Sequence, residues 1–435
     1  MRKVKGKTIL FFILYVVMFE GILINSFHIP GIIMYIADIL LVFLIIYSIK
    51  RNKKLGKEEK VIRNIVGIYM LIVMFAYMLN YQNILYFVGG FRNIFRFFFF
   101  FFLCTIYLTK SYMVEFFKNL DAIFYINAAI MMIQYFILGL NQDYLGGIFG
   151  THQGCNGPLN IFFVVIVSYS VLAYMNKKES LKSLIIKCGL ALVLAGLAEL
   201  KYFYIEFVII VIFAFLTTGF TLRKLSLVVF SIAGLAIGIK IIEQLFGMGY
   251  VFNVDFIIKD STSGGYTSTG DLSRGAFITA IEKGFLDTIG KKLVGLGLGN
   301  CESRTIFADA TPFYLRYRAL HYDWFASMHT FLEQGWCGLL FYGVFFLMIA
   351  VSTFQISKRY NIDLFYIKLT YLYTFLFFLV FFYNQTLRQD IAYLVAFCLA
   401  VSFVSRKDKN NKRIVHQVLY PSKKVIINKR AVKYK

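Results

Sequence analysis

The sequence predicts an all-α integral membrane protein with about 12 transmembrane helices and one large extracytoplasmic loop that contains short helices. The chain of 435 residues is 59% hydrophobic, only 16% of its residues are charged, and its mean hydropathy is +0.69. Apolar runs of about 17–22 residues follow one another, and each can cross about 30 Å of hydrocarbon as a helix. Residues 245–334 break this pattern with mixed polarity, so we expect them outside the bilayer core.

We expect four parts in the chain: transmembrane helices 1–9 in residues 1–244, the large loop in 245–334, helices 10–12 in 335–404 and a basic cytoplasmic tail in 405–435. The first apolar run, Ile9 to Phe27, is too long for a signal peptide, carries Glu20 and lacks a small-residue cleavage site, so it is predicted to be an uncleaved span. The later spans are expected at residues 31–48, 65–79, from 86 through Phe97 to Phe102, 122–140, 159–175, 184–200, 202–218, 225–246, 337–354, 364–382 and 391–404. The 49 phenylalanines suit lipid-facing helices.

Basic residues gather in alternate loops, which hold 32 of the 46 lysines and arginines. Cytoplasmic loops carry such an excess, so both termini are expected in the cytoplasm and residues 245–333 outside. The formal net charge of +23 lies in short clusters between apolar runs, which favours membrane anchoring over nucleic-acid binding. The tail from Arg406 is expected to be a disordered anchor, with contact to anionic lipids as the alternative.

A short helix is expected from Leu272 to Lys283, with Asp271 as its cap and Arg274 in its first turn. Backbone N–H groups and a guanidinium together form an anion site; the alternative is a surface arginine paired with Asp271. The glycine-rich stretch GLGLGN, residues 295–300, lacks the strand and helix of a phosphate loop, so we expect a tight irregular turn. No His/Cys cluster has zinc spacing, and no metal or cofactor is expected.

Titratable and basic side chains follow in the aromatic stretch after Phe313. His321 and Asp323 have the chemistry of a general base, because imidazole titrates near neutral pH. An interfacial belt of tyrosine and tryptophan with snorkelling arginines is the alternative. The stretch and the segment after it contain the candidates Arg316, Arg318, His321, Asp323 and His329.

Three cations fall in or beside predicted spans: Arg92, Arg96 and Lys201. Such groups are costly in lipid and often mark a site or a pathway, with snorkelling to the surface as the alternative. Because they are expected on the same side as Arg274, they favour one anionic ligand at the outer leaflet, such as a lipid diphosphate.

Five stretches, in this order, resemble the O-antigen polymerase and O-antigen ligase superfamily. They are GGIFGTHQGCNG from residue 146, AELKYF from 198, LSRGAF from 272, VGLGLGN from 294, and LHYDWF from 320 leading to FLEQGWCGLL. A ligase histidine usually lies eleven residues before the GxxG that opens the next span. Here Trp324 occupies that position before Gly335 to Gly338, which favours a polymerase.

The resemblance implies a metal-independent glycosyltransferase of the bacterial plasma membrane. It would join undecaprenyl-diphosphate-linked oligosaccharide repeat units at the outer face, for O-antigen, capsule or exopolysaccharide. Arg274 matches the loop arginine that engages the diphosphate, and His321 is the preferred base. A chain-length regulator and a flippase are the implied partners. A ligase-type transferase, or a flippase of lipid-linked glycan, is the alternative function.

Overall fold

The computed structural model describes residues 6–218, 222–246, 265–267, 270–303 and 310–407. Residues 247–264, 268–269 and 304–309 of the predicted large loop and the predicted tail after residue 407 lie outside the described residues. The named elements of the described part are all helices, and an isolated antiparallel bridge joins Tyr266 to Leu272. The predicted all-α class is confirmed for this part of the chain.

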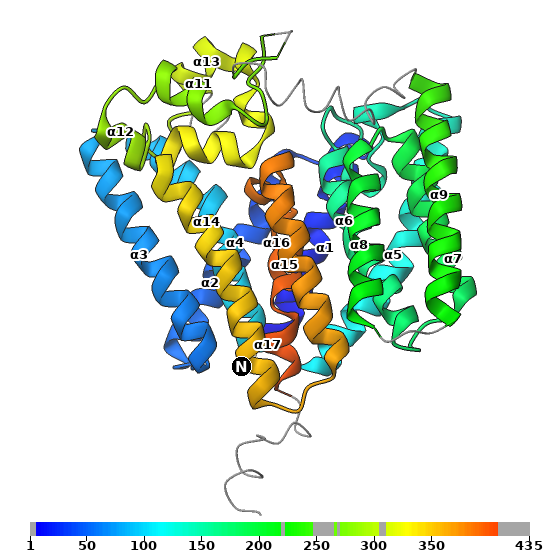
Figure 1. The fold of residues 1–435 in the computed structure, drawn as a ribbon. Helices are drawn as coiled ribbons and strands as arrows, with labels where there is room; N and C mark the ends of the chain where they lie inside the picture. The colour runs from blue at the N-terminus through cyan, green and yellow to red at the C-terminus, as the bar shows by residue number, and fades with distance from the viewer. Residues whose placement is uncertain (1–5, 219–221, 247–264, 268–269, 304–309, 408–435) are drawn as a thin grey trace, which may run out of the picture.

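The first half of the chain forms a series of long helices joined by short connections (Figure 1). These are α1 (Gly6–Asn25), η1 (Gly31–Ile33), α2 (Met34–Lys50), α3 (Lys57–Leu79), α4 (Ile84–Tyr107), α5 (Lys110–Phe136), η2 (Gln142–Tyr144), η3 (Gly147–Phe149), α6 (Asn156–Met175), α7 (Leu181–Leu197), α8 (Lys201–Thr217) and α9 (Leu222–Phe246).

The second half begins with short helices and returns to long ones. These are α11 (Phe277–Gly284), α12 (Ile289–Val294), α13 (Pro312–Tyr317), η5 (Arg318–Leu320), η6 (Tyr322–Trp324), α14 (Ala326–Arg359), α15 (Leu364–Tyr383), η7 (Thr386–Arg388), α16 (Ala392–Leu399) and α17 (Val401–Ser405).

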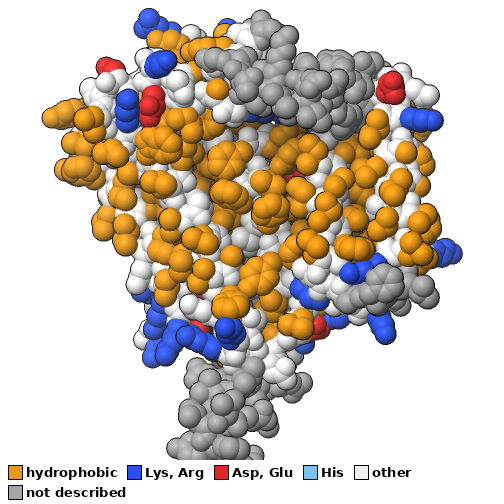
Figure 2. Space-filling view, viewed as in Figure 1, with side chains coloured by type: hydrophobic (Ala, Val, Ile, Leu, Met, Phe, Trp, Pro, Cys, Tyr) orange, Lys and Arg blue, Asp and Glu red, His pale blue; other side chains and the backbone are white. Residues whose placement is uncertain are grey.

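Among the described residues, eight helices are long and apolar enough to cross a membrane: α1, α2 with η1, α3, α4, α5, α6, α14 and α15. Figure 2 shows a broad band of hydrophobic side chains across the visible face of the bundle, with lysines and arginines below and above it. This pattern is that of a multi-pass membrane protein. The other four predicted spans correspond to α7, α8, α9 and the α16–α17 pair, which are outside this group, so the number 12 stays a prediction.

The short helices α11, α12 and α13 lie together at one end of the bundle (Figure 1). The described chain ends lie at the opposite end: Gly6 packs against the Tyr107 ring, and the Lys407 ammonium donates to the Leu108 carbonyl at 3.5 Å. Both ends of the described chain therefore share one face, opposite the short helices.

A second, smaller core holds the short helices on the bundle. Leu272, Phe277 and Ile281 pack against Met328 and Phe331 from the first turns of α14. Local capping supports two of these helices. Thr288 accepts from the Lys291 N–H at 3.2 Å, and Thr311 accepts from the Tyr314 N–H at 3.3 Å, with Pro312 at the first helical position.

The start of one predicted span differs from the structure, because hydropathy detects only the apolar part of a helix. Helix α5 begins at Lys110, well before the expected start at residue 122, and its early turns are charged. Helix α14 begins at Ala326, inside the predicted loop, where short helices were expected. The helix breaks at Gly335, whose φ of 57° and ψ of −151° are not helical.

The phenylalanine run of α4 is buried inside the bundle, against the expectation that phenylalanines face lipid. Phe97, Phe98, Phe100 and Phe101 have no exposed surface. The ring of Phe98 packs edge-on against Phe345 of α14, with ring centroids 4.8 Å apart. Aromatic pairs of this geometry add specific attraction to burial. The run therefore forms part of the central core of the bundle.

Candidate functional site

A histidine and an aspartate meet where the segment before α11 runs beside η5 and η6. The Leu272 N–H donates to the Leu320 carbonyl at 3.1 Å, which aligns the two segments. The His321 imidazole Nδ1 then lies 2.5 Å from Oδ1 of Asp271. His321 has a left-handed backbone, with φ of 50°, and its ring stacks on Trp324 at a centroid distance of 3.9 Å.

This pair has the geometry of a general base and the carboxylate that orients it. A carboxylate that accepts from Nδ1–H leaves the other ring nitrogen, Nε2, as a proton acceptor. The His321 side chain is 37% exposed, so a substrate hydroxyl can reach it. The carboxylate partner is Asp271 and not the sequence neighbour Asp323.

Asp271 was expected to cap a helix, and that prediction was wrong. Helix α11 begins at Phe277, and its N-cap residue is Ala276, which makes no side-chain cap. Arg274 lies in the turn before the helix rather than in its first turn. The Asp271 carboxylate instead pairs with His321, which is 50 residues away in the chain.

Arg274 is an exposed guanidinium held between two aromatic rings. It lies 4.8 Å from the ring centroid of Phe325 and 4.8 Å from that of Tyr383. The Tyr383 ring stacks in turn on Tyr202, with centroids 3.8 Å apart and planes 11° apart. No carboxylate of the described residues forms an ion pair with Arg274. Its positive charge is therefore not neutralised within this part of the chain and is available to an anion.

Lys201, next to Tyr202 at the start of α8, is already paired. Its ammonium lies 2.7 Å from the Glu199 carboxylate. Arg316 and Arg318 are exposed on the α13–η5 segment, and Arg316 lies over the Tyr317 ring at 5.3 Å. The structure shows no contact between these two arginines and Arg274.

Arg92 and Arg96, one helical turn apart on α4, form a neutral network with two aspartates. Arg92 Nε donates to Asp38 Oδ2 at 2.6 Å, and Arg96 pairs with Asp390. The Tyr393 hydroxyl donates to the other Asp38 oxygen at 2.7 Å. The charges of the two arginines are cancelled by those of Asp38 and Asp390. Because Arg96 is also buried, we assign this network to holding α4 against its neighbouring helices inside the bundle.

His329 lies in a second buried network, away from solvent. It has no exposed surface. Gln385 Nε2 donates to its Nδ1 at 3.1 Å, while its Nε2 faces Glu333 and Arg388, each at 3.4 Å. Both ring nitrogens are occupied, so His329 is placed to support the structure and not to meet a substrate.

Arg388 is the centre of this second network, and it is not among the site residues predicted from the sequence. Its Nη2 lies 2.6 Å from Glu302 and 2.7 Å from Glu333. Burial alone would lower the pKa of Arg388, but the two carboxylates raise it above its ordinary value, so the guanidinium stays charged. The signal was present: Arg388 lies in the polar stretch NQTLRQD between two apolar runs.

Glu302, His329 and Glu333 offer donor atoms within 4.8 Å of one another, as a metal site would. Arg388 already supplies a positive charge to both carboxylates. In addition, Glu333 Oε1 accepts from the backbone N–H groups of Gly299 at 2.9 Å and Cys301 at 3.0 Å. A metal ion would have to displace these partners.

Asp323 is partly buried and lies within electrostatic reach of His329 and His321. Burial raises its pKa above the ordinary aspartate value, and His329 opposes that shift. The structure thus separates the predicted catalytic residues. His321 pairs with Asp271 and His329 belongs to the Arg388 network, while Asp323 is partly buried two residues after His321.

The glycine-rich stretch locks onto the break in α14. Gly295, Gly297 and Gly299 all have positive φ, as expected for a tight irregular turn. A Cβ on Gly295 would lie 2.2 Å from the Glu333 carbonyl carbon, and one on Gly335 would lie 2.3 Å from the Lys292 oxygen. Only glycine allows the two backbones to approach this closely. The close packing explains the glycines at 295–299 and at 335, and it requires no role in nucleotide binding.

No family model matches the sequence, and no curated protein matches it.

Proposed function

We propose that the protein is a membrane glycosyltransferase that joins lipid-diphosphate-linked oligosaccharide repeat units at the face that carries α11–α13. The supporting observation is that the His321–Asp271 pair and Arg274 lie on two segments that one backbone hydrogen bond aligns. Both groups belong to the same two aligned segments, residues 271–274 and 320–325, and both are accessible. We take this face to be the outer one, as the distribution of basic residues predicts.

In the proposed reaction, Nε2 of His321 takes the proton from a hydroxyl of the acceptor sugar. The hydroxyl oxygen forms a bond to the anomeric carbon of the donor sugar while the bond from that carbon to the diphosphate oxygen breaks. The electron pair leaves with the lipid diphosphate. Attack opposite the leaving group inverts the anomeric configuration.

Arg274 is the residue we assign to the leaving diphosphate, because a fixed guanidinium stabilises the negative charge that develops there. Asp271 orients His321 and stabilises the imidazolium. Arg316, Arg318 and Lys201 lie at or near this face and are secondary candidates. Arg92 and Arg96 are neutralised by aspartates, so we assign them to the structure of the bundle.

The test is the glycan ladder of a strain that lacks the gene, complemented with variants. Loss of the protein should leave single-repeat products, and His321→Ala should fail to restore long chains while reaching normal membrane levels. Intact but untransferred polymer would instead identify a ligase-type transferase. Long chains at full yield from His321→Ala would refute the assigned base, and accumulation of unflipped lipid-linked repeats would favour a flippase.

A further inference from the structure

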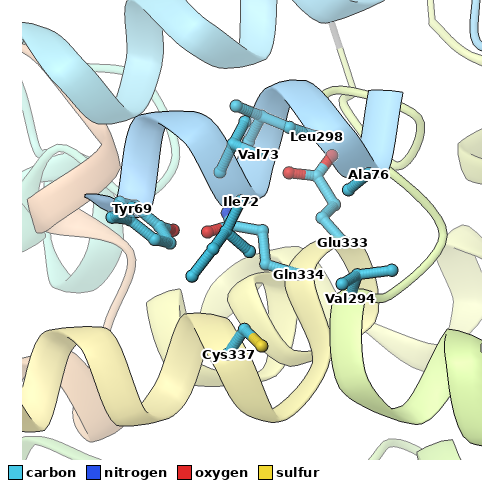
Figure 3. A pocket seen from close by; sticks show the side chains of 9 residues that line it. All are labelled: Tyr69, Ile72, Val73, Ala76, Val294, Leu298, Glu333, Gln334 and Cys337. Atoms are coloured by element: carbon cyan, nitrogen blue, oxygen red, sulfur yellow. The ribbon is translucent and has the colours of Figure 1, made fainter. Parts of the chain in front are cut away.

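A small cavity lies between α3 and the break in α14. Its volume is about 10 Å³. Tyr69 of α3 and Gln334, Glu333 and Cys337 of α14 line it, and apolar side chains form the rest of its wall (Figure 3). Gln334 directly precedes Gly335, so the cavity lies at the point where the helix loses its regular geometry.

Two buried polar side chains face this cavity without a hydrogen-bond partner. Tyr69 is 1% exposed and Gln334 is 3% exposed. Within the described part of the chain, neither the Tyr69 hydroxyl nor either amide atom of Gln334 forms a hydrogen bond. Figure 3 shows the hydroxyl and the amide pointing toward one another from the two helices.

Neither side chain is free to turn toward solvent. The Tyr69 ring stacks on Phe341 at a centroid distance of 3.6 Å, with planes 6° apart. Gln334 lies in the wall of the cavity with only 3% of its surface exposed. Burial of a polar group without a partner is unfavourable, so these groups need an acceptor and a donor that the neighbouring side chains do not supply.

Glu333 does not supply the missing hydrogen-bond partners of Tyr69 and Gln334. Its two carboxylate oxygens are used by Arg388 and by the N–H groups of Gly299 and Cys301. The volume fits one water molecule and nothing larger, since about 10–15 Å³ of accessible space is what a water needs. A hydroxyl and an amide each offer both a donor and an acceptor, so one water can bond to both.

We propose that this cavity binds one water molecule that bridges the Tyr69 hydroxyl and the Gln334 amide. The water joins α3 to the interrupted turn of α14, where regular helical bonding stops. It therefore fixes the segment that holds Glu333 and, through it, Arg388. This inference is independent of the proposed activity.

Thermal unfolding of the purified full chain in detergent tests the proposal. Tyr69→Phe and Gln334→Met should each lower Tm, and the double variant should lose less than the two single losses together, because both remove the same bridge. Tyr373→Phe is the matched reference, since its hydroxyl donates directly to the Val165 carbonyl at 3.0 Å. An unchanged or higher Tm for Tyr69→Phe would overturn the proposal, because removal of an unpaired buried hydroxyl relieves strain in a dry cavity.

An experimental map of the unmodified protein gives a second measurement that does not depend on whether the variants fold. Density for one ordered water between the Tyr69 hydroxyl and the Gln334 amide is the expected result. An empty cavity in a map that resolves other buried waters would overturn the proposal.

Discussion

His321 and Asp271 are 50 residues apart in the chain, and their side chains meet with 2.5 Å between Nδ1 and Oδ1. The contact depends on two segments that align through one backbone hydrogen bond and a small apolar core. It gives an exposed imidazole a fixed orientation, and the predictions about activity follow from it.

Asp271→Asn should lower the rate of chain extension by about 10²–10⁴-fold, the usual contribution of an oriented general base. The amide cannot stabilise the imidazolium as the carboxylate does. The measurement is the initial rate with purified protein and a lipid-linked repeat unit. Asp287→Asn is the control, because Asp287 is exposed on the loop before α12 and pairs only with Lys291 in the described part. Equal rates for both variants would contradict the role of Asp271.

Arg274→Ala should weaken donor use by about 10–100-fold, as expected when a charge-assisted hydrogen bond of about 1.5–3 kcal/mol is lost. Arg274→Lys keeps the charge but loses the flat guanidinium that fits between Phe325 and Tyr383, so it should give an intermediate loss. Arg63→Ala is the control, because Arg63 is exposed on α3 and bonds only Asn64 among the described residues. Steady-state rates against donor concentration measure the effect; a normal rate for Arg274→Ala at low donor would refute it.

The fold class follows from the sequence because hydropathy and charge placement are local properties. Long apolar runs, basic loops and the polar interruption of residues 245–334 are visible without any tertiary information. The glycine-rich stretch was also predicted as a tight turn, since only glycine adopts these backbone angles freely.

The pairing of charged residues could not be predicted, because it depends on contacts between distant segments. Arg96 and Asp390 are 294 residues apart, and Arg388 and Glu302 are 86 apart. An arginine in a span predicts that some partner exists, but it does not name the partner. For the same reason the sequence could not separate the exposed His321 from the buried His329.

Arg388→Met should lower the free energy of unfolding by about 3–5 kcal/mol, because it leaves the buried carboxylates of Glu302 and Glu333 without their cation. Arg359→Met is the matched control. Arg359 is 47% exposed and its partner Glu58 also bonds Arg406, so its loss should cost less than about 1 kcal/mol. Unfolding by denaturant in detergent measures both, and similar losses would contradict the central role of Arg388.

Asp323→Asn should stabilise the protein at neutral pH. Burial raises the pKa of Asp323 in the folded state, so the folded state binds more protons than the unfolded one between the ordinary and the raised value. The free energy of unfolding therefore falls as pH rises through that window, and the penalty persists above it. The asparagine variant lacks this penalty. The difference in the free energy of unfolding between the variant and the unchanged protein should therefore grow as pH rises and vanish in acid. A difference that is constant with pH would rule out this origin.

The orientation of the bundle is tested by labelling at its two ends. In a variant without the six native cysteines, a single cysteine replaces Arg316 on α13 or Lys358 in the last turn of α14. These positions belong to opposite faces, since α14 runs from the short helices to the end where the described termini lie (Figure 1). A membrane-impermeant maleimide added to intact cells should label the first and spare the second, because loops rich in lysine and arginine stay in the cytoplasm. The reverse pattern would place His321 and Arg274 in the cytoplasm, where the proposed transfer at the outer face cannot occur.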